Sequence, residues 1–373
     1  MSRHAYRIAL CLFAALIASK FSPQTGFTSL IRFGEAWNDR RLAALHELPI
    51  AIAPHSYGYD GQFYAQLALD PLLRGTETGQ VLDVPAYRAR RILLPAIAAI
   101  VGFGRPWWVL QVYALINVAC WFALAGLLRR MLPGNDGKSL ARWAGCMFGM
   151  GVLESVRQSL VDLPALLLLA LAIAAHERSR AARSTGWLAL ANLTKESSLL
   201  GTLALSVEGF RWPFFSKQRI ISLLVALAPL AGWSYYVSTR FPLSPSSSGA
   251  GNITWPLVGI IQHLNTCVAE IVAGNWDGRF TMGLLAVIGF AVQAWSLWRS
   301  PELRSGWWRV GAAYTLLLLV LSPWVWSGYW AASRALLPVT IAFNLLLPGN
   351  SRSFWALWVL GNLTMLHALW RFL

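Results

Sequence analysis

Charged side chains are scarce in this sequence. Only 13% of its 373 residues are Asp, Glu, Lys or Arg, whereas 56% are hydrophobic, and soluble domains usually carry about 25% charged residues. So few charges cannot give a chain of this length a polar surface, which excludes a soluble globular enzyme and a disordered chain. The scarcity of charge therefore predicts a protein that lies largely within a membrane.

Cysteine is also rare, and the common catalytic motifs are missing. The 4 cysteines include no Cys-x-x-Cys pair, so we expect neither a disulfide framework nor a cysteine metal site. The chain has no P-loop, no His-Glu-x-x-His, no Gly-x-Ser-x-Gly and no Asp-x-Asp. These absences argue against the nucleotide-binding, zinc-protease and serine-hydrolase classes that such motifs mark.

Basic residues outnumber acidic ones by 31 to 16, which gives a formal net charge of +15. A basic balance can mark a nucleic-acid-binding protein, but in a membrane protein the positive-inside rule is the first explanation for excess Lys and Arg. Basic residues gather in alternate connections between the apolar runs, for example at Arg129, Arg180 and Arg304. We therefore expect membrane lipid and no nucleic acid among the partners.

The hydrophobic residues occur in runs long enough to suggest membrane segments, since a spanning helix needs about 20 apolar residues. The clear runs cover residues 8–21, 107–128, 160–175, 220–237, 282–298, 310–326, 335–347 and 354–369, and weaker ones cover 141–153, 186–193 and 198–206. They predict an all-α polytopic membrane protein of about eleven membrane segments. We expect one transmembrane domain over residues 1–373.

The distribution of basic residues orients these segments. With the N-terminus in the cytoplasm, residues 22–106 form the first extracytoplasmic loop and residues 239–281 form the second. Residues 91–103 are apolar but too few to cross a membrane, so we expect an interfacial helix there. The topology holds only if residues 186–206 form a re-entrant hairpin with the polar residues 194–197 at its tip.

The densest polar and aromatic cluster lies in the first loop, at residues 55–64. Asp60 has glycines close on both sides, so backbone can approach a ligand there, and its carboxylate is the candidate general base. The neighbouring Tyr57, Gln62 and Tyr64 could bind sugar by stacking and hydrogen bonds. No metal site is expected from these residues.

Two further groups of charges stand out on the outer side. Arg88 and Arg91 break the positive-inside trend, and a guanidinium fits phosphate in a bidentate manner; the alternative is that they anchor the loop to lipid headgroups. Ionisable residues near the outer ends of the spans usually face a cavity or each other. These additional candidates for substrate binding are Glu154, Arg157, Asp162, Lys195, Glu196 and Arg334. Lys195 and Glu196 could instead only hold the hairpin tip together.

Several short motifs follow one another in order along the chain. They are Tyr59-Asp60-Gly61-Gln62-Phe63-Tyr64, Asp70-Pro71, Tyr87-Arg88-Ala89-Arg90-Arg91, Asp162, Leu193-Thr194-Lys195-Glu196-Ser197 and Arg334-Ala335-Leu336-Leu337-Pro338. With the first span, the acidic outer loop and the interfacial helix, this order resembles the GT-C superfamily of polytopic membrane glycosyltransferases. In detail it is similar to bacterial GT-C-like proteins linked to cell-surface glycopolymers.

The resemblance implies a GT-C-like bundle with interfacial helices in the first loop. It also implies transfer of a sugar from a polyprenyl-phosphate donor to a glycan, lipid or protein acceptor, on the outer face of a bacterial inner membrane. The first-loop acid of such enzymes is usually the base or a ligand-positioning acid, a role that falls here on Asp60. Because this motif has one Asp rather than an Asp-x-Asp pair, no cofactor is expected and dependence on a divalent metal is left open.

Two other classes of function fit the same composition. A transporter or flippase of lipid-linked sugars or other amphiphiles would use the arginines and aromatics without a base, and would be expected to show inverted repeats. A structural subunit of a membrane assembly would tolerate loss of the outer charges. The enzyme needs Asp60 as a base and the transporter does not, so the role of Asp60 distinguishes these two functions.

Overall fold

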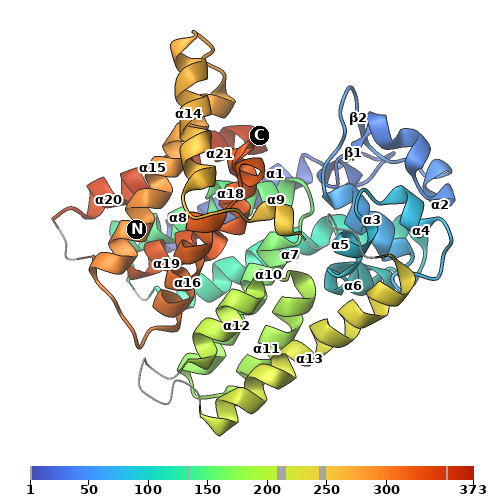
Figure 1. Ribbon diagram of the computed structural model, residues 1–373. Helices are drawn as coiled ribbons and strands as arrows, with labels where there is room; N and C mark the ends of the chain where they lie inside the picture. The colour runs from blue at the N-terminus through green and yellow to red at the C-terminus, as the bar shows by residue number, and fades with distance from the viewer. Residues whose placement is uncertain (1, 133, 208–215, 243–248, 350–351) are drawn as a thin grey trace.

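The computed structural model describes residues 2–132, 134–207, 216–242, 249–349 and 352–373. Within them most of the chain is helical, which confirms the all-α prediction (Figure 1). The strands β1 (Phe33–Gly34) and β2 (Ile52–Ala53) form a short parallel pair within the first loop. Residues 243–248, which belong to the expected second loop, lie outside the described part.

Three of the described helices are long and apolar enough to cross a membrane. They are α7 (Pro106–Met131), α13 (Lys217–Arg240) and α15 (Gly278–Arg299). Shorter apolar helices include α1 (Ser2–Ala18), α14 (Val258–Val272), α16 (Gly306–Val320) and α19 (Leu337–Leu346). The expected count of about eleven segments is therefore not confirmed, because most apolar runs fold into helices shorter than a full span.

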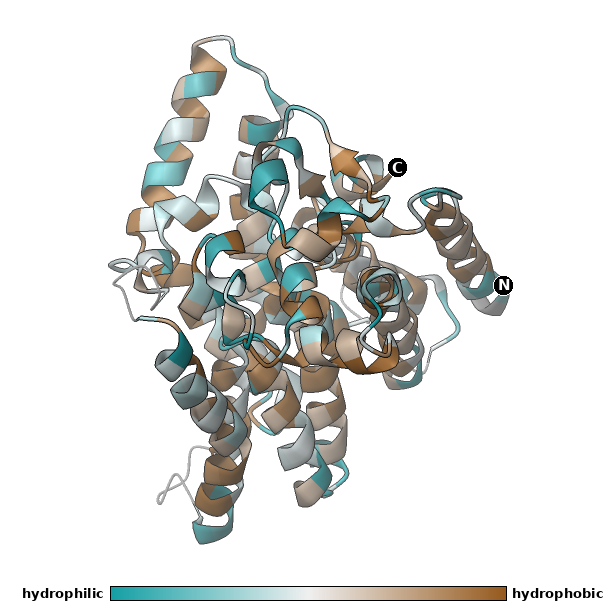
Figure 2. Cartoon of the chain, turned by 90° about the vertical axis from the view of Figure 1, so that its right-hand side faces the viewer, coloured by the Kyte–Doolittle hydropathy of each residue, from teal (hydrophilic) through white to brown (hydrophobic). Residues whose placement is uncertain are grey.

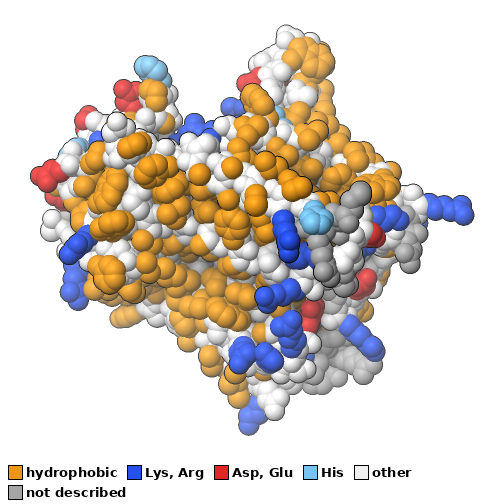
Figure 3. All heavy atoms as spheres, turned by 180° about the vertical axis from the view of Figure 1, so that it is seen from behind, with side chains coloured by type: hydrophobic (Ala, Val, Ile, Leu, Met, Phe, Trp, Pro, Cys, Tyr) orange, Lys and Arg blue, Asp and Glu red, His pale blue; other side chains and the backbone are white. Residues whose placement is uncertain are grey.

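The surface supports a membrane protein. On α13 the large apolar side chains of Ile221, Leu224 and Val225 are exposed, as on a helix that faces lipid. Figure 2 shows apolar residues along most helices and polar residues mainly in the connections. The face in Figure 3 carries a broad hydrophobic surface, with many lysines and arginines along its lower edge.

The helix α7 supports the centre of the fold through polar side chains on its buried face. Tyr113 donates a hydrogen bond to the carbonyl of Ser159 (2.9 Å), and Asn117 donates one to the carbonyl of Leu160 (2.8 Å). Ser159 and Leu160 lie in the connection between α9 (Met150–Arg157) and α10 (Asp162–Glu177). The two bonds fix the connection that places Asp162 at the start of α10, because buried carbonyls need a donor.

The first loop folds onto this centre as a set of short elements. They are η1 (Thr28–Leu30), η2 (Glu35–Arg40), α2 (Ala43–His46), α3 (Gly61–Leu69), α4 (Thr78–Val81), α5 (Pro85–Ala89) and α6 (Leu93–Val101). The expected interfacial stretch at 91–103 thus contains α6. Helix α3 is buried over nearly its whole length and packs against α6 and α7.

The expected hairpin at 186–206 coincides with a pair of helices, α11 (Ala181–Thr194) and α12 (Ser198–Ser206). The break between them contains Lys195 and Glu196, at the polar residues that were expected to form a tip. Asn192 on α11 donates to the carbonyl of Ala226 on α13 (3.1 Å), so α11 is tied to a long apolar helix. In Figure 1, α10 to α13 form one lobe of the molecule.

The apolar run expected to form a membrane segment at residues 354–369 is interrupted. Residues 354–369 form two short helices, α20 (Phe354–Gly361) and α21 (Met365–Phe372). The carbonyl of Gly361 accepts a bond from Gln293 (2.6 Å), and the amides of Asn344 and Asn362 pair with each other (3.1 Å). Such side-chain partners satisfy the backbone that a broken helix frees. The remaining elements are α8 (Gly137–Met147), η4 (Ala250–Asn252), α17 (Pro323–Trp326) and α18 (Tyr329–Ala335).

Gly61 offers a direct test of how α3 seats on the centre of the fold. A Cβ at this position would lie 2.1 Å from the carbonyl oxygen of Gln158, which is backbone and cannot swing away. We expect Gly61→Ala to lower the free energy of unfolding by about 1–3 kcal/mol. The control is Gly126→Ala on the exposed side of α7, where a Cβ would meet nothing within 4 Å. Thermal unfolding in detergent compares the two, and equal unfolding temperatures would contradict the packing described.

Candidate functional site

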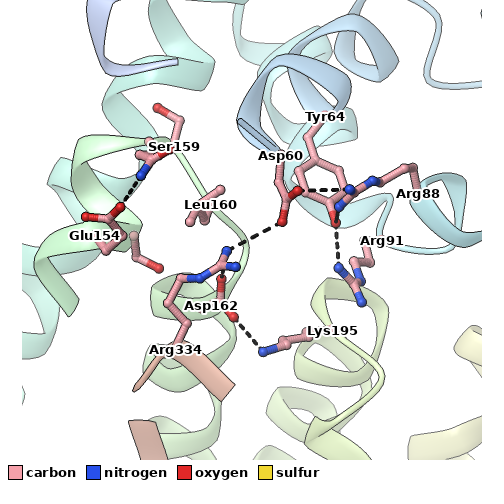
Figure 4. Close-up of polar contacts among 12 residues, drawn as sticks. Asp60, Tyr64, Arg88, Arg91, Glu154, Ser159, Leu160, Asp162, Lys195 and Arg334 are labelled. Atoms are coloured by element: carbon pink, nitrogen blue, oxygen red, sulfur yellow. Dashed lines mark hydrogen bonds and ion pairs between the residues drawn. The ribbon is translucent and has the colours of Figure 1, made fainter. Parts of the chain in front are cut away.

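Charged side chains from four separate parts of the chain meet beside the first loop (Figure 4). Asp60 lies just before α3, Asp162 begins α10, Lys195 lies between α11 and α12, and Arg334 lies on α18. Arg88 joins them from α5. The structure therefore brings into one group residues that the sequence singled out for their charge but could not place relative to one another.

The charges alternate in sign along this group. The Oδ1 of Asp60 is 2.9 Å from Nη2 of Arg88, and its Oδ2 is 3.5 Å from Nη1 of Arg334. The same Nη1 lies 3.5 Å from Oδ2 of Asp162, whose Oδ1 is 2.5 Å from Nζ of Lys195. Arg334 thus bridges two carboxylates. We call the residues Asp60, Arg88, Asp162, Lys195 and Arg334 the charge chain.

The carboxylate of Asp60 serves this group rather than the helix that follows it. Asp60 occupies the position before α3, yet its side chain makes no capping hydrogen bond to the helix. The positive end of the helix still favours a negative charge there. Both carboxylate oxygens remain directed toward arginines, and 29% of the side chain is exposed.

Arg88 is held on its other side by Asp83, a residue that the sequence analysis did not select. Asp83 accepts from Nε and Nη2 of Arg88 at 2.8 and 2.7 Å, a bidentate pair with planar geometry. The guanidinium of Arg88 is therefore shared between Asp83 and Asp60. The signal in the sequence was an acid five residues before the arginine and two residues before Pro85, which begins a helix.

A second branch joins the first loop to the α11–α12 break. Arg91 donates to the hydroxyl of Tyr64 (2.6 Å) and to Oε2 of Glu196 (2.8 Å). The ring of Tyr87 stacks on Arg91 at 4.2 Å and its hydroxyl accepts a further bond. Three residues selected from sequence, Tyr64, Arg91 and Glu196, thus lie together, and all their charges are paired in this state.

The electrostatics of the loop residues favour the charged forms. Burial alone would raise the pKa of Asp60, but the positive charges of Arg88, Arg334 and Arg91 and the hydrogen bond from Arg88 outweigh it and hold this pKa well below its usual range. Burial opposes the charge of Arg88 as well, and the carboxylates of Asp60 and Asp83 more than compensate, so its pKa is raised. Asp60 is ionised at any physiological pH.

A narrow cleft with a volume of about 10 Å³, room for about one water molecule, lies beside Asp162, Lys195 and Arg334. Its lining includes those three side chains and Tyr314, together with apolar residues, among them Leu166, Leu169, Leu337 and Pro338. The lining thus combines cationic and apolar side chains, the two kinds of contact that an amphiphile with an anionic head makes. Among the described residues, no three His, Cys, Asp or Glu side chains gather into a group that could hold a metal ion.

Two of the selected residues lie elsewhere in a second buried cluster. Glu154 and Arg157, both on α9, form ion pairs with each other and, through Glu154, with Arg371 on α21 (3.6 and 3.3 Å). No contact joins Glu154 directly to Asp60 in the described structure. Arg371 was not selected from sequence, because a lone arginine near a chain end gives no signal of its distant partner.

Two residues expected to bind sugar have other surroundings. The amide of Gln62 is buried, accepts from the backbone nitrogen of Gly34 (3.0 Å) and donates to the carbonyl of Tyr57 (2.9 Å). Both polar atoms of the Gln62 amide thus bond to the backbone of the first loop, which argues against contact between this amide and a sugar. The side chain of Tyr57 is 79% exposed. Gly61 also serves packing rather than a ligand, since the carbonyl of Gln158 fills the space beside it.

Acid sensitivity tests the ion pairs of Asp60. Because its folded-state pKa is lowered, its contribution to stability is present above the unfolded value, near 4, and is lost as the pH falls through the folded value. We expect Asp60→Asn to unfold about 2–4 °C below the wild type at neutral pH. The gap should narrow below about pH 4. Thermal unfolding across this range measures the gap, and a gap that widened on acidification would rule out this assignment.

No protein-family model, curated protein or solved structure matches this chain. The geometry of the charge chain and of the adjoining cleft is therefore the basis for assigning a function.

Proposed function

We propose that this protein is a GT-C-type membrane glycosyltransferase. It would transfer a sugar from a polyprenyl-phosphate carrier to a glycan, lipid or protein of the cell envelope, at the extracytoplasmic face of a bacterial inner membrane with the N-terminus in the cytoplasm. The observation that carries the proposal is the meeting of Asp60 with Arg88 and Arg334, next to a narrow cleft whose lining combines cationic and apolar side chains.

The proposed reaction needs a base and a site for the leaving phosphate. The acceptor hydroxyl oxygen forms a bond to the anomeric carbon of the sugar while the bond from that carbon to the phosphate oxygen breaks. Asp60 takes the hydroxyl proton, and polyprenyl phosphate departs with the bonding electrons. Arg334 and Lys195, which both line the cleft, are placed to stabilise the charge that develops on the phosphate.

The ion pairs of Asp60 have a consequence for its chemistry. A carboxylate whose pKa is held low by two arginines is a weak base. A phosphate bound to Arg334 or Arg88 would compete for the same N–H groups and draw positive charge away from Asp60. In this proposal, Asp60 becomes more basic only when the donor is bound, so its activation is coupled to binding.

A transporter or flippase of lipid-linked sugars is the alternative. Its cations would bind the same phosphate, but no proton would be transferred, and Asp60 would act only as a partner of Arg88 and Arg334. No observation in the described structure favours this function over the enzyme. The two differ in whether the bond between sugar and phosphate breaks.

Asp60→Asn tests the enzyme. We expect transfer to fall by about 10²–10⁴-fold, because an amide cannot accept the proton. The assay follows release of polyprenyl phosphate from a panel of polyprenyl-phosphate hexoses and pentoses in proteoliposomes with cell-envelope acceptor. The control is Asp277→Asn, which changes an exposed residue that caps α15 away from the charge chain. Full transfer by Asp60→Asn would exclude Asp60 as the base.

Lys195→Gln tests the phosphate site. Lys195 lines the cleft and pairs with Asp162 at 2.5 Å, so its loss should weaken binding of the lipid phosphate. We expect the KM for the donor to rise about tenfold or more, with the KM for the acceptor unchanged. Steady-state kinetics with donor and acceptor varied in turn gives the two values. A change confined to the acceptor KM would place the phosphate elsewhere.

A further inference from the structure

The second cluster, around Glu154, contains buried polar groups that the proposed chemistry does not use. Its members are Glu154, Arg157 and Gln158 from α9 and the residue that follows it, Tyr329 and Trp330 from α18, and Arg371 from α21. Glu154 is 1% exposed and accepts from Arg371 and from Gln158. Arg371 stacks on the ring of Trp330 at 4.7 Å.

Several polar atoms of this cluster have no hydrogen-bond partner among the described residues. They are Nε of Arg371, Oε1 of Gln158, the hydroxyl of Tyr329 and Nη1 of Arg157, the last of which lies 3.6 Å from Oε2 of Glu154, beyond hydrogen-bond distance. Buried polar atoms without a partner are costly and uncommon, so each calls for a missing partner. Gln158 and Tyr329 are both 1% exposed as residues.

The charge of the cluster shows which kind of partner is missing. Two guanidinium groups face one carboxylate, so one positive charge is uncompensated. The unpartnered N–H groups are cationic and require an acceptor, which an oxyanion supplies. The side chains of Arg157 and Arg371 are 29% and 24% exposed, so a ligand can reach them from outside.

The cluster also lies beside the charge chain. Helix α18 carries Tyr329 at its start and Arg334 near its end, and it packs against α9. Arg334 has an unpartnered Nε of its own, while its Nη1 contacts Asp60. In Figure 4, Glu154 and Asp60 lie on opposite sides of Arg334.

We propose that the Glu154 cluster is an acceptor subsite for an acidic sugar, that is, for a sugar unit bearing a carboxylate or a phosphate. Arg157 and Arg371 bind the oxyanion, and Gln158 and Tyr329 bind hydroxyls. The assignment of this ligand as the acceptor rests on the proposed function, because a base at Asp60 must have the acceptor next to it. Binding of the acidic sugar itself does not depend on that function.

The test uses the full chain in neutral detergent with three soluble probes. Methyl glucuronide carries a carboxylate, glucose 6-phosphate carries a phosphate, and methyl glucoside has the same ring without charge. A ligand that binds only the folded protein raises the unfolding temperature. We expect a rise with at least one acidic probe, which also identifies the anionic group, and none with the glucoside.

Variants separate a binding site from a structural ion pair. Arg157→Gln and Arg371→Gln should each weaken binding of the acidic probe about tenfold or more, and Arg371→Lys should restore part of it. Arg279→Gln is the matched control, since the side chain of Arg279 donates to the carbonyl of Ser327 (2.8 Å) and is not part of the Glu154 cluster. A purely structural role would lower the unfolding temperature of the variants and leave the ligand-induced rise unchanged.

The outcomes also separate this proposal from the proposed function. Asp60→Asn should bind the acidic probe as the wild type does, whether or not it transfers sugar. Equal effects of glucuronide, glucose 6-phosphate and glucoside on the wild type, or no effect of any at the highest soluble concentration, would overturn the subsite. That comparison needs no variant, so it stands even if an arginine substitution prevents folding.

Discussion

The ion pairs of Arg334 with Asp60 and Asp162 are the contacts on which the rest of the site depends. One guanidinium nitrogen lies 3.5 Å from both carboxylates, and these come from the first loop and from the start of α10. Charges buried in a largely apolar protein are costly unless each has a partner. The alternation of sign from Arg88 to Lys195 meets this requirement, and it holds four distant segments together.

The same requirement explains why polar groups support the site from behind. Tyr113 and Asn117 on α7 bond to the carbonyls of Ser159 and Leu160, and so hold the start of α10 in place. The absence of a side chain at Gly61 lets α3 approach the carbonyl of Gln158. Contacts to the backbone therefore fix the positions of Asp60, just before α3, and of Asp162, at the start of α10. The two carboxylates face each other across Arg334 for this reason.

How much was predictable from the sequence depends on the kind of residue. Asp162, Lys195 and Arg334 stood out because charges near the ends of apolar segments need partners. Asp60 stood out for its polar and aromatic neighbours, and Arg88 for a positive charge on the outer side, although the pairing of these residues could not be read from the chain. Asp83 and Arg371 were missed because each looks ordinary without its distant partner. The helix break after Gly361 was missed because Gln293, which bonds the carbonyl of Gly361, is far away in sequence. Gln62 was selected because it lies within the polar motif, and the backbone bonds of its amide could not be read from the sequence.

The paired state of the charge chain also favours one type of ligand over another. A soluble phosphate would have to displace Asp162 or Asp60 from Arg334 and would exchange one ion pair for another, with little net gain. A phosphate that carries a lipid chain would add burial of that chain against Leu166, Leu169 and Leu337 in the adjoining cleft. The apolar contact then supplies the free energy that the charge exchange lacks. Under the proposed function, a site built of mutually satisfied charges would discriminate by what is attached to the phosphate, which is the selectivity that a lipid-linked donor requires.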